Sequence, residues 1–174
     1  MESDPLARVL RRLVGARRRA RTAALAPHAR PVGAGLARGT RPGARYWGDC
    51  YRRAAAYVLA HAPGGDPGPP PRGLTLVHGR CLTGPVAWGH AWVELPAGLV
   101  FDGVRQQFYD GAGYRRALGA VAEATYGPAA TAAWLRATGH WGPWHRSPAP
   151  ARAGQAPGAA AGLRTGAGGA GGAG

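Results

Sequence analysis

The chain has 174 residues, enough for one domain with a modest hydrophobic core. Its formal net charge is +14, yet every basic residue is arginine and the sequence contains no lysine, asparagine or isoleucine, a bias typical of a very GC-rich genome. No apolar run approaches the ~20 residues that span a bilayer, and the basic N-terminus lacks the apolar segment of a secretory signal, so a cytoplasmic protein is expected.

Basic charge is concentrated at the two ends of the chain. Residues 1–45 hold 11 arginines against two acids, residues 46–145 hold 8 against six, and residues 146–174 hold 3 against none. We therefore predict three parts: a basic Arg-rich helix with a linker at 1–45, a folded core at 46–145, and a disordered tail rich in glycine and alanine at 146–174.

An amphipathic helix is predicted over residues 5–21. Apolar residues recur there at helical spacing, with arginines around them: Leu6, Val9, Leu10, Leu13 and Val14. Such a helix suits contact between residues 8–21 and nucleic acid or an anionic membrane surface. The alternatives are a solvated helix and an overhang translated from a misassigned start codon.

The predicted core opens with a helix that begins at Cys50. Asp49 is a suitable N-cap, and residues 50–60 are rich in alanine, which favours a helix. One stripe of this helix is apolar and is expected to face the core: Tyr51, Ala54, Ala55, Val58 and Ala62. A loop rich in proline and glycine follows at 64–73.

The rest of the core combines strands with helices. Three β-rich segments bounded by turn residues are predicted as strands: 74–79, 87–95 and 99–104. Residues 96–98 join the last two strands. A helix interrupted at 127–128 is predicted over 114–137, and an aromatic turn follows at 138–144. The predicted fold class is α+β, with the helix that carries Cys50 packed on a small antiparallel sheet, helices after it, and disordered flanks.

Cys50 is the candidate nucleophile. A free thiol supplies little thiolate at neutral pH, and the amides of a helix N-terminus or a neighbouring imidazolium lower its pKa. The predicted place of Cys50 at the first position of a helix therefore suits a nucleophile. It also suits an oxyanion hole formed by the Cys50 amide and a second donor, for which the indole of Trp47 is a candidate.

A histidine and a carboxylate are predicted on neighbouring strands, where the histidine requires an orienting group. If Leu95 pairs with Leu99, then Asp102 lies diagonal to His90. If Glu94 pairs with Gly98 instead, Asp102 lies directly opposite His90. In both registers the numbers of two paired residues add to an even sum, which places both side chains on one face of the sheet. A register with an odd sum would place them on opposite faces. We therefore predict an even register and a His90–Asp102 pair.

Each of these residues has a simpler interpretation when taken alone. Cys50 resembles a small buried hydrophobe, His90 a histidine at the edge of the core, and Asp102 a turn residue. Their order, the helix start and the strand parity together favour a catalytic site. A zinc site formed by His78, Cys81, Cys50 and His90 is disfavoured, because His78 and Cys81 are three apart and so point to opposite faces of a strand. Neither a metal nor a cofactor is predicted.

Two weaker candidates for substrate contacts are Trp92 and His140. Trp92 shares a strand face with His90, although packing within the hairpin is the alternative. His140 lies in the aromatic turn with Trp141 and Trp144, which we expect to anchor the C-terminal part of the core. Cys81 is predicted to be an ordinary thiol.

The order of Cys50, Gly89-His90-Ala91-Trp92-Val93-Glu94 and Val100-Phe101-Asp102 resembles the transglutaminase-like branch of the papain-fold cysteine enzymes. The resemblance covers roughly residues 46–110. It implies that Cys50 is the nucleophile, His90 the general base and acid, and Asp102 the group that orients His90.

Two further segments bear on this resemblance. The residues 138–144 are similar to the end of small phage and bacterial proteins that share this core. Six residues before Cys50, where papain-like enzymes carry a glutamine, this chain has Ala44, so the second oxyanion donor is not assigned by the resemblance.

The expected function is cysteine-dependent acyl transfer, either hydrolysis or transamidation of an amide bond in a peptide or protein. The alternative is a catalytically inactive scaffold or binding module, of phage or mobile-element type, whose basic N-terminal segment contacts nucleic acid. The sequence predicts no oligomeric state.

Overall fold

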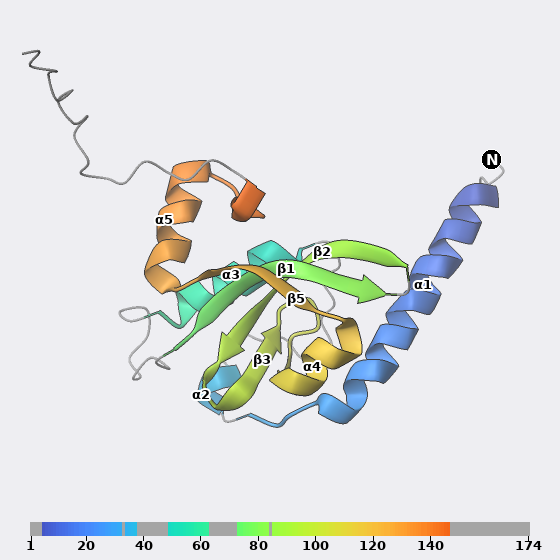
Figure 1. Ribbon diagram of the computed structural model, residues 1–174, viewed down its shortest axis with the longest axis horizontal. Coiled ribbons are helices and arrows are strands. Elements are labelled where there is room, and N and C mark those ends of the chain that lie inside the picture. Colours follow the sequence, from blue (N-terminus) through green and yellow to red (C-terminus); the bar gives the residue numbers. More distant parts are fainter. Residues whose placement is uncertain (1–4, 33, 38–48, 63–72, 84, 147–174) are drawn as a thin grey trace, which may run out of the picture.

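The computed structural model describes residues 5–32, 34–37, 49–62, 73–83 and 85–146. In chain order its elements are α1 (Pro5–Leu25), η1 (Ala26–His28), α2 (Ala34–Ala37), α3 (Cys50–Ala60), β1 (Thr75–Thr83), β2 (Val86–Leu95), η2 (Pro96–Gly98), β3 (Leu99–Asp102), β4 (Gln107–Asp110), α4 (Gly111–Leu118), β5 (Val121–Tyr126), α5 (Pro128–Thr138) and η3 (Trp144–Arg146). The strands form one antiparallel sheet in the order β4-β3-β2-β1-β5, with helices packed on it (Figure 1). The α+β prediction is therefore confirmed.

The two faces of the sheet carry separate hydrophobic clusters. Side chains alternate along β2, so Ala91 and Val93 pack with α3 residues such as Val58 on one face. On the other face Trp92 packs with Tyr114 of α4. The candidate histidine, His90, has the same parity as Trp92 and so faces α1 and α4.

Residues 121–126 were predicted to be helical, and this prediction is wrong. Helix α4 ends at Gly119, which adopts the left-handed conformation that glycine accommodates most easily (φ 54°). The chain then forms β5, which pairs with β1. The strand β4 was not predicted at all, because its four residues are too short to show a period.

The N-terminal segment contributes to the core before residue 46, where the folded part was predicted to begin. Leu25 has 1% of its surface exposed and packs beside Tyr114. Beyond the helix, Ala29 bridges to Tyr109, and the backbone N–H of Arg30 donates to the carbonyl of Phe108 at 3.1 Å. The predicted tail lies outside the described residues, apart from Arg146. Among the described residues, no helix is long and apolar enough to cross a membrane.

The aromatic turn packs on the sheet as predicted. Trp144 has no exposed surface, and its ring contacts those of His78, Tyr126 and Trp134. Its backbone N–H donates to Nδ1 of His78 at 3.4 Å, so this histidine is built into the core on the α3 face.

The burial of His78 predicts an acid-dependent loss of stability. Burial, with a smaller effect from His145, lowers the pKa of His78 from 6.5 to about 3. The unfolded chain therefore binds this proton more readily, and stability is lost as the pH falls from 6.5 towards about 3. In His78→Phe, which keeps the ring but cannot titrate, the free energy of unfolding should depend less steeply on pH, by up to about 1.4 kcal/mol per pH unit. Denaturant titrations across this range measure it, and equal slopes would contradict it.

Candidate active site

Strand register brings His90 and Asp102 together. Val93 pairs with Phe101 and Leu95 with Leu99, which is the first of the two even registers predicted. The side chain of Asp102 therefore lies diagonal to that of His90, and the Nε2 atom of His90 is 3.4 Å from Oδ2 of Asp102. Both side chains are buried, with 1% and 0% exposed.

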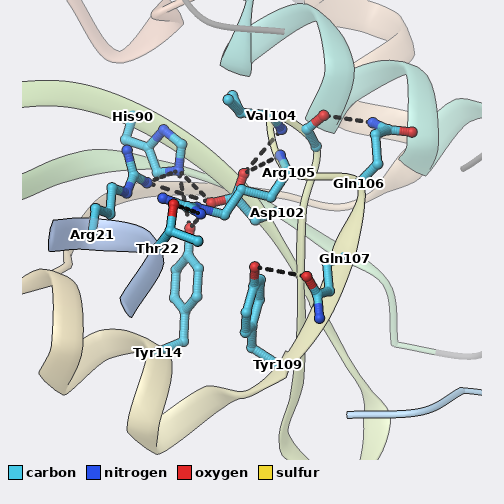
Figure 2. A network of polar contacts seen from close by, with 11 residues as sticks. Arg21, Thr22, His90, Asp102, Val104, Arg105, Gln106, Gln107, Tyr109 and Tyr114 are labelled. Carbon is cyan, nitrogen blue, oxygen red and sulfur yellow. Dashed lines mark hydrogen bonds and ion pairs between the residues drawn. The ribbon is translucent and has the colours of Figure 1, made fainter. Parts of the chain in front are cut away.

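The Asp102 carboxylate accepts hydrogen bonds from four further donors (Figure 2). They are the backbone N–H groups of Val104 at 2.9 Å and Arg105 at 3.2 Å on Oδ1, and the Tyr114 hydroxyl at 3.0 Å and the Arg21 guanidinium at 3.4 Å on Oδ2. Burial alone would raise the pKa of this carboxyl, but His90 and then Arg21 outweigh it and hold the pKa well below its usual range. Asp102 is therefore an ionised group inside the protein.

Arg21 and Tyr114 belong to this site, although the sequence did not indicate them. Arg21, on α1, places NH2 3.1 Å from Nε2 of His90 and its guanidinium 4.3 Å from the ring centre of Trp88. The Tyr114 hydroxyl is 3.0 Å from the same Nε2. The one sequence signal for Arg21 is its spacing of four from the buried Leu25, which puts both on one face of α1.

Cys50 is the first residue of α3, as predicted, and its side chain is buried, with 8% of the residue exposed. Burial raises the pKa of its thiol, while backbone hydrogen bonds from Ala91, Tyr51 and Cys50 itself act to lower it. Asp49 occupies the N-cap position, but its carboxylate binds Arg52 instead of a helix amide. The first backbone N–H groups of α3 are therefore free to donate hydrogen bonds to the Cys50 sulfur.

The thiol lies beside the strand that carries the histidine. Cys50 contacts the backbone of Ala91, the residue next to His90 and two before the first pair of the β2–β3 ladder. The Nδ1 atom of His90 is buried and has no hydrogen-bond partner among the described residues. No hydrogen bond joins it to Cys50 in the described part of the chain, so the structure pairs His90 with Asp102 and places the thiol at the backbone of Ala91.

Comparison of the chain with protein-family models, curated proteins and solved structures found no match. The chemistry of the site must therefore be deduced from its own residues. They provide a thiol among backbone amides, an imidazole with one nitrogen engaged and one open, and an ionised carboxylate that can orient the imidazole. These are the groups that nucleophilic acyl transfer requires.

The three weaker candidates differ in what the structure shows of them. Trp47 lies outside the described residues. Trp92 has no exposed surface, and its ring packs on those of His90 and Tyr114, so it supports the histidine from within the core and does not border a cleft. His140 is exposed, and its hydrogen bonds stay within its own segment, to Gly142 and Trp144 among others.

The remaining histidine and cysteine of the zinc alternative do not converge. His78 pairs with Ala91 and points to the α3 face, whereas Cys81 pairs with Trp88 and points to the α4 face. Among the described residues, no three His, Cys, Asp or Glu side chains gather as metal ligands. Burial raises the pKa of the Cys81 thiol to about 12, so Cys81 is an unreactive core residue.

Proposed function

We propose that this protein catalyses cysteine-dependent acyl transfer at an amide bond. Cys50 is the nucleophile, His90 the general base and acid, and Asp102 the group that orients His90. The observation that carries the proposal is the buried His90–Asp102 pair, which engages Nε2 of the imidazole, together with the Cys50 thiol at the backbone of Ala91, the residue next to His90.

The reaction proceeds in two balanced steps. The Cys50 thiol gives its proton to Nδ1 of His90, and the sulfur forms a bond to the substrate carbonyl carbon while the carbonyl electron pair moves to oxygen. When this pair returns, the carbon–nitrogen bond breaks, and the leaving amine takes the proton from His90. Water or a second amine then attacks the thioester through the same histidine and restores the thiol.

Backbone amides at the start of α3 would stabilise the oxyanion. The N–H groups of Cys50 and Tyr51 have no partner within the helix ladder, whose first bond in the turn runs from Arg53 to Asp49 at 3.0 Å. Amides at this end of a helix also carry its positive dipole. They are suited to bind the developing negative charge next to the sulfur, with Trp47 as a further candidate donor.

The resemblance to the transglutaminase-like branch of papain-fold enzymes supports the same assignment. The order of helix, histidine strand and carboxylate strand follows that pattern. The resemblance suggests a peptide or protein amide as substrate and requires no cofactor. Both hydrolysis and transamidation fit this chemistry, since they differ only in whether water or an amine takes the acyl group.

The proposal is tested with p-nitrophenyl acetate, a small acyl donor. Attack by Cys50 should release a burst of nitrophenolate and leave one acetyl group on the protein, measured by absorbance and intact mass. Cys50→Ala should show neither. Cys81→Ala, which removes the other buried thiol, should retain both. A burst that persists in Cys50→Ala would exclude Cys50 as the nucleophile.

A binding module is the second candidate. The N-terminal end of α1 lies away from the sheet (Figure 1). Along this helix Arg12 and Arg19 are exposed. Arg21, the last residue of the predicted contact region, is buried at His90 and is not available to nucleic acid. The test measures the affinity of the protein for a DNA oligonucleotide at increasing salt concentration. An affinity that falls with rising salt, in a protein that p-nitrophenyl acetate does not acylate, would support the binding module.

A further inference from the structure

The Arg21 guanidinium lies beside the His90–Asp102 pair. Its NH2 group is 3.1 Å from Nε2 of His90 and 3.4 Å from Oδ2 of Asp102, and it forms a triangle with these two atoms, which are themselves 3.4 Å apart (Figure 2). The side chain is 4% exposed, and its guanidinium also lies over Trp88. Arg21 is therefore fixed within the site by α1.

The partners of Nε2 place opposite demands on the proton of His90. The Arg21 guanidinium can only donate, so its contact at 3.1 Å requires Nε2 to accept. The Tyr114 hydroxyl gives its one proton to Asp102 at 3.0 Å, so its oxygen can accept a proton from Nε2 when Arg21 is withdrawn. A neutral imidazole that accepts at Nε2 carries its proton on Nδ1. In that form His90 cannot take the proton of Cys50.

We propose that Arg21 is a positioning residue of this site, which sets the tautomer of His90 by holding the proton on Nδ1, and that withdrawal of Arg21 from Nε2 produces the tautomer able to act as base. The catalytic consequence rests on the proposed function, whereas the tautomer itself does not. When Arg21 leaves Nε2, this nitrogen can carry the proton and donate it to Asp102, and Nδ1 becomes free to accept.

The surroundings of His90 support a neutral imidazole. Charged or titratable groups surround the ring: Arg21 on α1, Asp102 at the end of β3, Arg105 in the turn after it, and Tyr114 on α4, with Cys81 of β1 in the hydrophobic cluster on the same face of the sheet. Burial is the largest effect and lowers the pKa of His90, Asp102 raises it, and Arg21 and Arg105 lower it again.

The test is the tautomer of His90, read from two-bond proton–nitrogen NMR correlations of protein labelled with ¹⁵N-histidine. Spectra are taken at about pH 8, above the ordinary histidine pKa, and His90→Gln assigns the signals. Wild type should carry the proton on Nδ1. Arg21→Met, which keeps apolar contact with Trp88, should move it to Nε2. Arg21→Lys, which can also only donate, should retain the wild-type pattern, as should the matched control Arg19→Met on the exposed side of α1.

Each outcome is decisive. A wild-type proton on Nε2 overturns the proposal by itself, even if Arg21→Met does not fold, and so does a proton that stays on Nδ1 in folded Arg21→Met. In Arg21→Met the acetylation of Cys50 should also accelerate, by about tenfold, as the competent tautomer becomes the major one. A tautomer that moves without any acylation of Cys50 supports the assignment of Arg21 and rejects the proposed acyl transfer.

Discussion

Replacing Asp102 with alanine is expected to lower the free energy of unfolding by about 3–5 kcal/mol. The substitution removes the acceptor of two buried backbone N–H groups, a tyrosine hydroxyl and a guanidinium. Arg21 would then be a buried cation without its carboxylate. The loss should exceed that of an exposed ion pair, because neither side chain can recover solvent without movement of α1.

The loss caused by Asp102→Ala should depend on pH with a defined sign. The pKa of Asp102 is lower in the folded protein than the 3.8 of the free side chain, so its contribution is complete above about pH 4 and declines as the pH falls below 3.8. Denaturant titrations of both proteins between about pH 3 and pH 7 measure the difference. Asp110→Ala, which removes the half-exposed N-cap of α4, is the matched control and should cost about 1 kcal/mol. An Asp102 effect no larger than that of Asp110 would contradict the account.

The sequence was most informative where local geometry determines the register. The three residues Pro96, Ala97 and Gly98 join β2 to β3, and two of them adopt left-handed conformations, Ala97 at φ 59° and Gly98 at φ 69°. So short a connection leaves few possible pairings, and parity then puts His90 and Asp102 on one face. The helix start at Cys50 was also predictable, because its alanine-rich sequence follows a suitable N-cap residue.

The elements that the sequence did not predict depend on distant partners. The segment Val121–Tyr126 follows a helix, and three of its residues suit a helix as well as a strand. It becomes a strand because the edge of β1 is available to pair with it. That edge is formed by residues of β1 that lie about forty to fifty positions earlier in the chain, from Arg80 paired with Val121 to Leu76 paired with Tyr126. A single-sequence period cannot represent such a contact.

The burial of Arg21 in the site could not be predicted from the sequence for a different reason. It belongs to an arginine-rich helix in which every basic residue has the same local appearance, and such residues are usually solvated. Docking of α1 against α4 selects this one arginine for burial beside Leu25 and Tyr114. The site is therefore completed by a segment that the sequence placed outside the folded core.

The most direct test of the central claim is the rate at which iodoacetamide alkylates Cys50 in wild type and in His90→Gln, as a function of pH. Cleavage after arginine separates the two thiols, with Cys50 in the peptide 46–52 and Cys81 in the peptide 81–105, so mass spectrometry follows each one alone. Cys81, whose pKa burial raises to about 12, should stay unalkylated in both proteins and serves as the internal reference.

If the tautomer of neutral His90 with Nδ1 free takes the proton of Cys50, the wild-type rate should vary little between about pH 6.5 and pH 8, because burial lowers the pKa of His90 from 6.5. In His90→Gln the rate should depend on free thiolate, whose pKa is raised by burial, and should rise about tenfold per pH unit. At about pH 6.5 the variant should be roughly a hundredfold slower. Identical pH profiles for the two proteins would show that His90 does not serve Cys50 and would contradict the assignment of this site.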